Sequence, residues 1–131
     1  IYKWEVNQLA IEKSLVSGSM TMLILKLLSE KDMYGYEIIR ALDERSDSTF
    51  QYREGTLYPI LHKLENKGFV TSYKEKTQQG KERKYYSITA KGQEQFAEES
   101  RQWQVFSNAV NKVVYGKGGA IWTEGNLSPE F

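Results

Sequence analysis

The sequence of 131 residues contains no cysteine and only one histidine, His62. Without cysteine, the chain forms no disulfide bond, has no thiolate nucleophile and offers no sulfur ligand to zinc. A single histidine cannot complete a closed zinc site without such ligands. We therefore expect neither a metal nor another cofactor, and the lack of cysteine fits a cytoplasmic protein.

Long apolar runs are also missing. The longest stretch, Met20–Leu28, is interrupted by Lys26, and it reaches about half of the roughly 20 residues that a helix needs to cross a bilayer. Residues 1–13 do not have the pattern of a signal peptide. We expect no contact with a membrane.

The sequence also lacks a recognisable combination of catalytic residues. Carboxylates occur in pairs, Asp43-Glu44 and Glu98-Glu99, but no nucleophile, base and orienting group can be assembled around them. Solvated helix faces account for these pairs, so we do not expect an enzyme.

The net charge of +1 conceals a basic segment in the middle of the sequence. Residues 62–92 contain eight basic and three acidic residues, whereas residues 1–61 and 93–131 each have a net charge of −2. Such a segment predicts a local surface for a polyanion. The alternative is a solvated hairpin that needs its charges to stay in solution.

Helical and extended segments follow one another in a definite order. Apolar residues at helical spacing predict helices, and segments rich in Tyr, Val, Thr and Ile predict strands. On the second helix we expect Tyr36, Ile39 and Leu42 to face inward. Ser17-Gly18-Ser19 leaves open a break in the first helix, and we favour one continuous helix. The predicted elements are helices at 5–29, 34–44, 55–66 and 93–115, strands at 69–76 and 82–89, and a flexible, glycine-rich tail at 116–131 that ends like a cloning junction.

Three short helices followed by a two-stranded hairpin are typical of a winged helix-turn-helix domain, which we place at residues 5–92. The expected fold class is mainly α with a small β-hairpin, followed by a C-terminal dimerisation helix. In this arrangement the third helix enters the major groove, and the hairpin, or wing, lies over flanking phosphates. Pro59 is expected in the first turn of the third helix, where its missing N–H costs little, and Gly68 is expected to end that helix.

The third helix has two distinct faces. Leu57, Ile60, Leu61 and Leu64 share the face that we expect in the core. On the other side, the small size of Gly55 and the lack of a long side chain at Pro59 would let the helix start approach a nucleic-acid backbone. An ordinary amphipathic helix with a mixed outer face is the alternative. The outer face presents Gly55, Thr56, Tyr58, Pro59, His62, Lys63 and Asn66.

The predicted hairpin is rich in cations and tyrosines. Its loop contains Gly80, and its strands carry Lys74, Lys76, Lys81, Arg83 and Lys84. A small turn with a cationic rim suits a wing across the sugar-phosphate backbone. We expect Tyr86 and Tyr73 to pack within the hairpin, because strands favour aromatic cross-strand pairs.

The last helix carries an apolar seam with a heptad spacing. Phe96, Trp103 and Val110 are seven residues apart, and Glu99, Phe106 and Val113 fill the complementary positions. Such a seam predicts self-association, with help from the first helix through Leu9. Trp103 has two interpretations that stay open: an apolar interface residue, or a platform on which a flat ligand stacks between two subunits.

Four motifs together resemble the PadR family of bacterial transcriptional regulators. They are Tyr34-Gly35-Tyr36-Glu37-Ile38, then Glu-Gly-Thr-Leu-Tyr-Pro-Ile-Leu at 54–61, Leu-Glu-Asn-Lys-Gly at 64–68 and Arg-Lys-Tyr-Tyr-Ser-Ile-Thr-Ala-Lys-Gly at 83–92. The resemblance covers about residues 15–115. It implies a dimeric, mostly repressing winged-helix protein of the smaller subfamily, which has one short C-terminal helix and includes multidrug-sensing regulators. Residues 17–21, Ser-Gly-Ser-Met-Thr, depart from the Gly-Thr-Leu and acidic residue that members often carry.

The resemblance also implies roles for particular residues. The DNA contacts of the family would fall on Thr56, Tyr58 and the basic wing, and an aromatic residue on the last helix, here Trp103, would stack on the ligand. With the residues argued above, the expected DNA contacts are Tyr36, Gly55, Thr56, Tyr58, Pro59, His62, Lys63, Lys74, Lys81, Arg83 and Lys84. The expected dimer interface is Leu9, Phe96, Trp103, Phe106, Val110 and Val113.

We thus expect a repressor that is relieved by a small planar or phenolic ligand. Its expected partners are double-stranded DNA with an inverted-repeat operator, a second copy of itself and a small aromatic effector. The alternative is a winged-helix module that contacts another protein without binding DNA. The basic wing and the small residues at the start of the third helix favour DNA.

Overall fold

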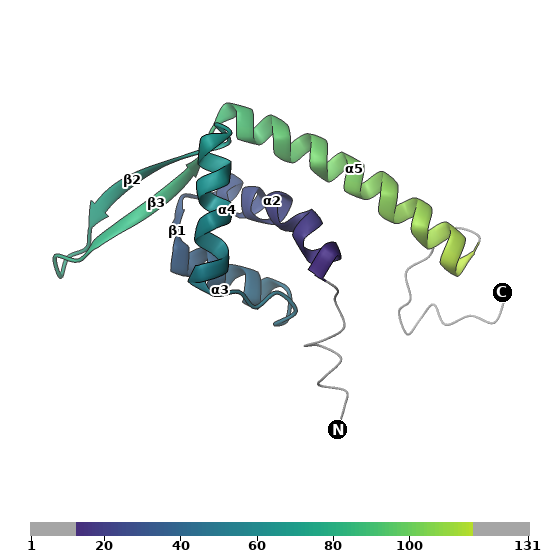
Figure 1. The fold of residues 1–131 in the computed structure, drawn as a ribbon, viewed down its shortest axis with the longest axis horizontal. Coiled ribbons are helices and arrows are strands. Elements are labelled where there is room, and N and C mark those ends of the chain that lie inside the picture. The colour runs from purple at the N-terminus through teal and green to yellow at the C-terminus, as the bar shows by residue number, and fades with distance from the viewer. Residues whose placement is uncertain (1–12, 117–131) are drawn as a thin grey trace, which may run out of the picture. The chain divides into compact units, whose positions relative to one another are not determined.

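A computed structural model describes residues 13–116 of the chain. It has four helices and a three-stranded antiparallel sheet with the strand order β1-β3-β2 (Figure 1). The predicted helices and both hairpin strands are confirmed to within three residues at the ends that lie in the described range. The elements are α2 (Lys13–Glu30), β1 (Met33–Tyr34), α3 (Gly35–Arg45), α4 (Glu54–Asn66), β2 (Val70–Lys76), β3 (Glu82–Ile88) and α5 (Ala90–Tyr115).

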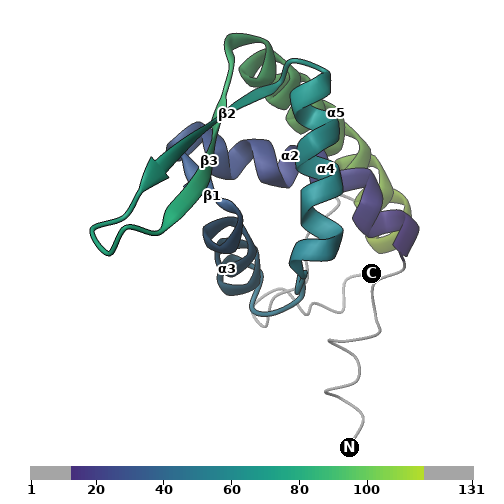
Figure 2. The ribbon, with the colours of Figure 1, turned by 60° about the vertical axis from the view of Figure 1, so that its left-hand side comes forward.

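The chain divides into two compact units, the first ending at Phe96 and the second beginning at Ala97. The first unit contains α2, α3, α4, the sheet and the start of α5. The rest of α5 belongs to the second unit. In both views the β2–β3 hairpin extends away from α2, α3 and α4 (Figure 2).

The core of the first unit is built from the apolar faces of α2, α3 and α4. On α4, the spacing of Leu57, Leu61 and Leu64 places all three on one buried face, as predicted, and Ile60 packs at its edge. The sheet closes this core with three side chains, Met33 from β1, Val70 from β2 and Tyr86 from β3. The other core residues are Met20, Ile24, Leu25, Leu27, Leu28, Met33, Ile38 and Leu42.

The continuity of the first helix is confirmed over the described residues. α2 runs through Gly18 without interruption. A Cβ added there would have no heavy atom within 4 Å. Gly18 therefore costs the helix some conformational entropy but marks no break. The predicted part of this helix at residues 5–12 lies outside the described range.

One prediction about the second helix is wrong. Tyr36 was expected to face inward, but its side chain is 52% exposed, and Ile38 occupies the core instead. Ile38 and Leu42 are four residues apart and define the buried face of α3. Because Tyr36 lies two residues before Ile38, it is about 200° around the helix from that side chain.

The end of α4 is set by Gly68, as predicted. Gly68 has a φ of 81°, its N–H donates to the Glu65 carbonyl, and the N–H of Phe69 donates to the Leu64 carbonyl. This pair of bonds is a Schellman motif. The position of Pro59 was predicted less well: α4 begins at Glu54, so Pro59 lies in the second turn rather than the first.

The hairpin is joined by a third strand that the sequence did not predict. Met33 and Tyr34 form β1 and pair with Tyr86 and Tyr85 of β3. A strand of two residues has no periodicity from which to predict it. The consequence for the site is that the wing is bonded directly to the residues that precede α3.

Candidate nucleic-acid interface

α4 presents an exposed outer face on the opposite side from its core residues. Gly55, Thr56, Tyr58, Pro59, His62 and Lys63 are all exposed, as predicted from the spacing. A Cβ added at Gly55 would meet nothing within 4 Å. This face therefore combines hydrogen-bond donors with a start that has little side-chain bulk.

Cations line the wing on both strands. Lys74, Lys81 and Lys84 are exposed and Arg83 is half-buried. The Lys74 amino group lies 4.0 Å from a Glu82 carboxylate oxygen. Within residues 13–116, no ion pair involves Lys81, Arg83 or Lys84. The positive charge of these three side chains is therefore not neutralised by ion pairs in this part of the chain.

A row of aromatic rings anchors the wing to the segment before α3. The rings of Tyr73 and Tyr85 stack with centroids 5.7 Å apart, and Tyr85 meets the edge of Tyr34 at 5.4 Å. The guanidinium carbon of Arg83 lies 4.4 Å above the Tyr34 ring centroid, a cation–π contact. Tyr73 packs against its cross-strand partner Tyr85, as expected, although it remains 42% exposed, whereas Tyr86 is buried in the core of the first unit.

A hydrogen bond holds Tyr73, the tyrosine at the other end of this row of rings. The Tyr73 hydroxyl donates to a carboxylate oxygen of Asp32 at 2.7 Å. This bond to a negative acceptor raises the pKa of Tyr73 to about 12. Asp32 lies in the turn that leads into β1, so the bond joins the wing to the approach to α3.

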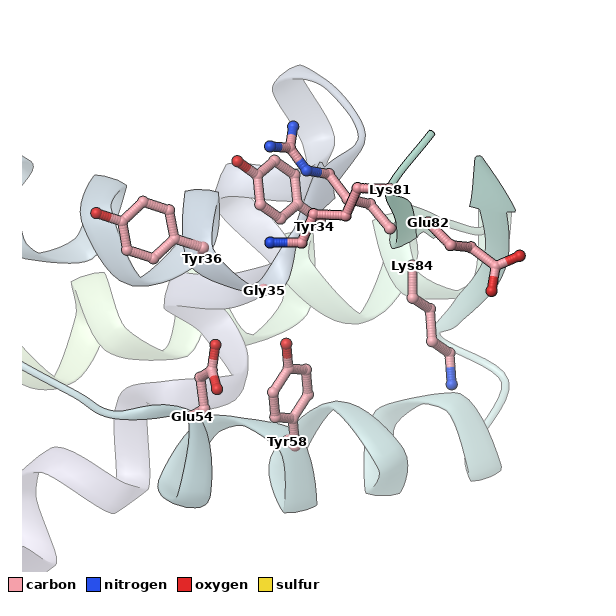
Figure 3. A pocket seen from close by; sticks show the side chains of 9 residues that line it. Tyr34, Gly35, Tyr36, Glu54, Tyr58, Lys81, Glu82 and Lys84 are labelled. Atoms are coloured by element: carbon pink, nitrogen blue, oxygen red, sulfur yellow. The ribbon is translucent and has the colours of Figure 1, made fainter. Parts of the chain in front are cut away.

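A pocket of about 420 Å³ lies between the start of α3, the start of α4 and the wing (Figure 3). Tyr58 projects into this space from α4, with its hydroxyl directed toward Gly35. A methyl group on Gly35 would lie 2.5 Å from that hydroxyl oxygen, so a larger residue at position 35 would displace the end of the Tyr58 side chain. The lining residues are Tyr34, Gly35, Tyr36, Glu54, Tyr58, Lys81, Glu82, Arg83 and Lys84.

The pocket brings together five of the residues predicted to contact DNA. Tyr36, Tyr58, Lys81, Arg83 and Lys84 line it. Gly55, Thr56, Pro59, His62 and Lys63 lie on the outer face of α4 outside its lining, and Lys74 lies elsewhere on the wing. Four lining residues were not predicted from the sequence: Tyr34, Gly35, Glu54 and Glu82. Three of them belong to the quoted motifs, so the motifs themselves were the signal.

The part of α5 in the second unit carries an exposed apolar stripe. Trp103, Phe106, Val110 and Val113 recur at spacings of three and four, and their exposed fractions are 49%, 58%, 39% and 86%. Val114, one turn after Val110, extends the stripe and was not predicted. Within the stripe, the rings of Trp103 and Phe106 have centroids 6.2 Å apart.

One predicted interface residue, Phe96, does not belong to this stripe. Phe96 belongs to the first unit and packs, half-buried, against its core, which accounts for its apolar character without a second subunit. Leu9 lies outside the described residues.

No three His, Asp or Glu side chains in residues 13–116 are grouped so that they could hold a metal ion. None of the described helices is both long and apolar enough to span a bilayer.

Comparisons with known proteins place this geometry in context. Residues 24–98 match the model of the transcriptional regulator PadR-like family. The chain is 32% identical over 106 residues to the uncharacterized protein X of Lysinibacillus sphaericus, a match that covers 81% of this chain and 97% of the relative. It is also 32% identical over 85 residues to the transcriptional regulator YqjI of Escherichia coli, over 65% of this chain but only 39% of YqjI.

A solved structure gives the same picture. The PadR-like transcriptional regulator of Bacillus cereus superposes with a TM-score of 0.71 at 31% identity, covering 80% of this chain and 100% of that protein.

Proposed function

The chain belongs to the PadR-like family of transcriptional regulators, and from that premise we propose that it is a homodimeric repressor. Its operator is an inverted repeat, and a small planar or phenolic ligand releases the repressor from DNA. Members of this family are DNA-binding regulators and not enzymes. The proposal adds the assembly, the direction of regulation and the effector.

The observation that carries the DNA-binding role is the combination of two neighbouring surfaces in the first unit. The exposed face of α4 offers Thr56, Tyr58 and His62 as hydrogen-bonding side chains. On the wing, Lys81, Arg83 and Lys84 form no ion pair within the described residues. Phosphate contacts supply affinity for any sequence, whereas contacts to base edges supply selectivity. We assign the first task to the wing and the second to α4.

The exposed stripe of α5 supports a dimer. Monomeric proteins seldom expose several large apolar side chains in one row, and the spacing of Trp103, Phe106, Val110 and Val113 suits packing against a second copy of the same helix. A two-fold dimer presents two α4 helices related by a dyad. The half-sites of the operator would then be centred roughly 10 base pairs apart, or a multiple of that distance.

Trp103 is the residue on which we place the effector. Two copies of this indole across the dyad would offer flat apolar surfaces to a planar ring. A ligand held there relieves repression only if it prefers a dimer geometry that fits DNA poorly. Quenching of tryptophan fluorescence by planar dyes tests this assignment. Trp103→Ala should remove the quenching and leave DNA binding intact.

The DNA-binding role is tested with a salt series. DNA from the promoter of the protein's own operon is titrated with the wild type and with the triple variant Lys81→Ala, Arg83→Ala and Lys84→Ala. We expect the variant to weaken binding to all sequences and to lower the salt slope by about 0.9 for each phosphate that the wing no longer neutralises.

The matched control carries Lys26→Ala, Arg101→Ala and Lys112→Ala, which remove the same charge outside the wing. It should keep the wild-type salt slope. If the wild type binds no DNA from this promoter or from a randomised library, the winged-helix domain serves a protein partner instead.

A further inference from the structure

The start of α5 is bonded to the end of α4 through three consecutive carbonyl groups (Figure 1). The carbonyl oxygens of Lys67, Gly68 and Phe69 each accept a hydrogen bond from Thr89 or Lys91. We call this set of contacts the clasp. We propose that Thr89 and Lys91 are positioning residues for DNA recognition, because the clasp holds α4 against α5 and thereby sets the spacing of half-sites that the dimer accepts. The inference rests on the proposed function and adds the residues that determine its spacing requirement.

The hydroxyl group of Thr89 bonds to both helices. It donates to the Gly68 carbonyl at 2.7 Å and accepts the N–H of Gly92 at 3.0 Å. Thr89 directly precedes α5, and Gly92 is the third residue of that helix, so the second bond is an N-cap. One side chain therefore joins the segment that ends α4 to the first turn of α5.

Lys91 adds a positive charge at the end of α4. Its amino group donates to the Lys67 carbonyl at 2.9 Å and lies 5.5 Å from the centroid of the Phe69 ring. Lys67 is the C-cap residue of α4, where the helix dipole favours a cation. Within residues 13–116, Lys91 forms no ion pair, so no carboxylate in this part of the chain competes with the contact to α4.

The backbones on the two sides of the clasp are in close contact. The N–H of Thr89 donates to the Phe69 carbonyl at 3.0 Å, which continues the pairing of Val70 with Ile88 in the sheet. A Cβ on Gly92 would collide with the same carbonyl oxygen. Packing at this distance leaves the start of α5 little freedom to move relative to the end of α4.

α5 continues without a break from the clasp to the apolar stripe, because it is one helix from Ala90 to Tyr115. In the proposed dimer, the seam holds two copies of α5 together, and each clasp holds one α4 on its own α5. The separation of the two α4 helices then depends on the clasp. A weaker clasp would let α4 follow a displaced half-site, and one added base pair displaces a half-site by about 3.4 Å and rotates it by about 35°.

The test varies the spacing of the inverted repeat that the wild-type protein selects from a randomised library. Fluorescence anisotropy measures binding to this operator, to operators with one base pair more or less between the half-sites, and to an isolated half-site. Lys91→Met keeps the aliphatic stem and removes the ammonium group. We expect altered spacing to weaken wild-type binding by about tenfold and Lys91→Met binding by less than about threefold. The isolated half-site should bind equally well to both proteins.

Lys67→Met is the matched control, because it removes a charge beside the clasp and keeps the carbonyl that accepts the hydrogen bond from Lys91. It should keep the wild-type preference for one spacing. Thr89→Val, which removes the hydroxyl, should relax the preference as Lys91→Met does, and Thr89→Ser should preserve it. Thermal unfolding defines the temperatures at which every variant is folded, and binding is compared only there. If Thr89→Val does not fold, Lys91→Met alone decides.

Two results for Lys91→Met would overturn the proposal. An unchanged preference for one spacing would show that α4 is positioned without the clasp. Weaker binding by one common factor to every duplex, the isolated half-site included, would show that Lys91 contributes only charge or stability. A wild type that binds all spacings equally well would instead refute the proposed dimer on an inverted repeat.

Discussion

Gly92 shows how one missing side chain can fix the junction between the sheet and a helix. It is buried in the first turn of α5, and its N–H donates to the Thr89 hydroxyl at 3.0 Å. A Cβ at this position would collide with the carbonyl oxygen of Phe69 and would lie 2.8 Å from the Ile88 side chain. The close approach of two backbone segments therefore requires glycine.

We predict that Gly92→Ala destabilises the protein by about 1–3 kcal/mol, the usual cost of forcing an extra group into a packed site. Urea unfolding followed by circular dichroism measures the change. Gly18→Ala is the control, since a Cβ at Gly18 meets no atom within 4 Å. It should stabilise α2 by about 0.5–1 kcal/mol. Equal effects at the two glycines would contradict the packing argument.

The bond between Tyr73 and Asp32 predicts a dependence of stability on alkaline pH. The carboxylate acceptor raises the folded-state pKa of Tyr73 from 10.0 to about 12. Its contribution to stability is therefore complete below pH 10 and disappears as the pH rises toward 12. We expect Tyr73→Phe to lose less stability than the wild type over this interval, as measured by chemical unfolding at a series of pH values.

Asp32→Asn provides the spectroscopic check. Without the negative acceptor, the phenolate absorbance of Tyr73 should develop near the ordinary pKa of tyrosine, about 10. An unchanged titration curve would show that the hydrogen bond is not formed in solution.

At the scale of elements, α2 and α3 are joined by a charged link on the surface. Arg45 at the end of α3 donates two hydrogen bonds to the Glu30 carboxylate at the end of α2. This pairing, assisted by Lys26, lowers the pKa of Glu30 from 4.5 to about 2. The link should therefore stabilise the fold fully above pH 4.5 and cease to do so as the pH falls toward 2.

We predict that Glu30→Gln reduces the loss of stability that the wild type shows as the pH falls from 4.5 to about 2. Arg45→Gln should act in the same way, because it removes the main cause of the lowered pKa. The acid unfolding curve is the measurement. Glu98→Gln, which breaks a pair within α5, should leave the acid unfolding of the first unit as it is in the wild type.

The elements differ in how far the sequence could predict them. The helical spacing of apolar residues predicted α4 and its buried leucines, because the regular geometry of a helix sets the direction of each side chain. β1 could not be found, since its two residues are a strand only by virtue of their bonds to Tyr85 and Tyr86. The same holds for the pocket: Gly35 and Tyr58 belong to motifs recognised from the sequence, but their contact depends on the packing of α3 against α4.

Tyr36 illustrates the other limit. It was expected both to face inward with Ile39 and Leu42 and to contact DNA, and the helical spacing alone did not decide between these two positions. The structure places it on the surface beside the pocket. Aromatic residues with a polar end satisfy both patterns, so only the position of the neighbouring core residue Ile38 resolves the choice.

At the scale of the whole molecule, the proposed assembly depends on one helix. We predict that Trp103→Glu combined with Val110→Glu produces a monomer, because two charges would have to be buried in a seam of apolar side chains. Sedimentation velocity measures the change in mass. Arg101→Glu with Lys112→Glu serves as the control for charge on the same helix and should remain dimeric. A dimer that persists in the first variant would place the interface elsewhere.

The contact of Tyr58 with Gly35 has a consequence for how this sequence can evolve. The constraint runs in one direction: a larger residue at position 35 must displace the end of the Tyr58 side chain, whereas a smaller residue at position 58 only leaves space beside the glycine. The two sites are thus epistatic across 23 positions of sequence. In a set of descendants, changes at position 35 should follow changes at position 58 and not precede them.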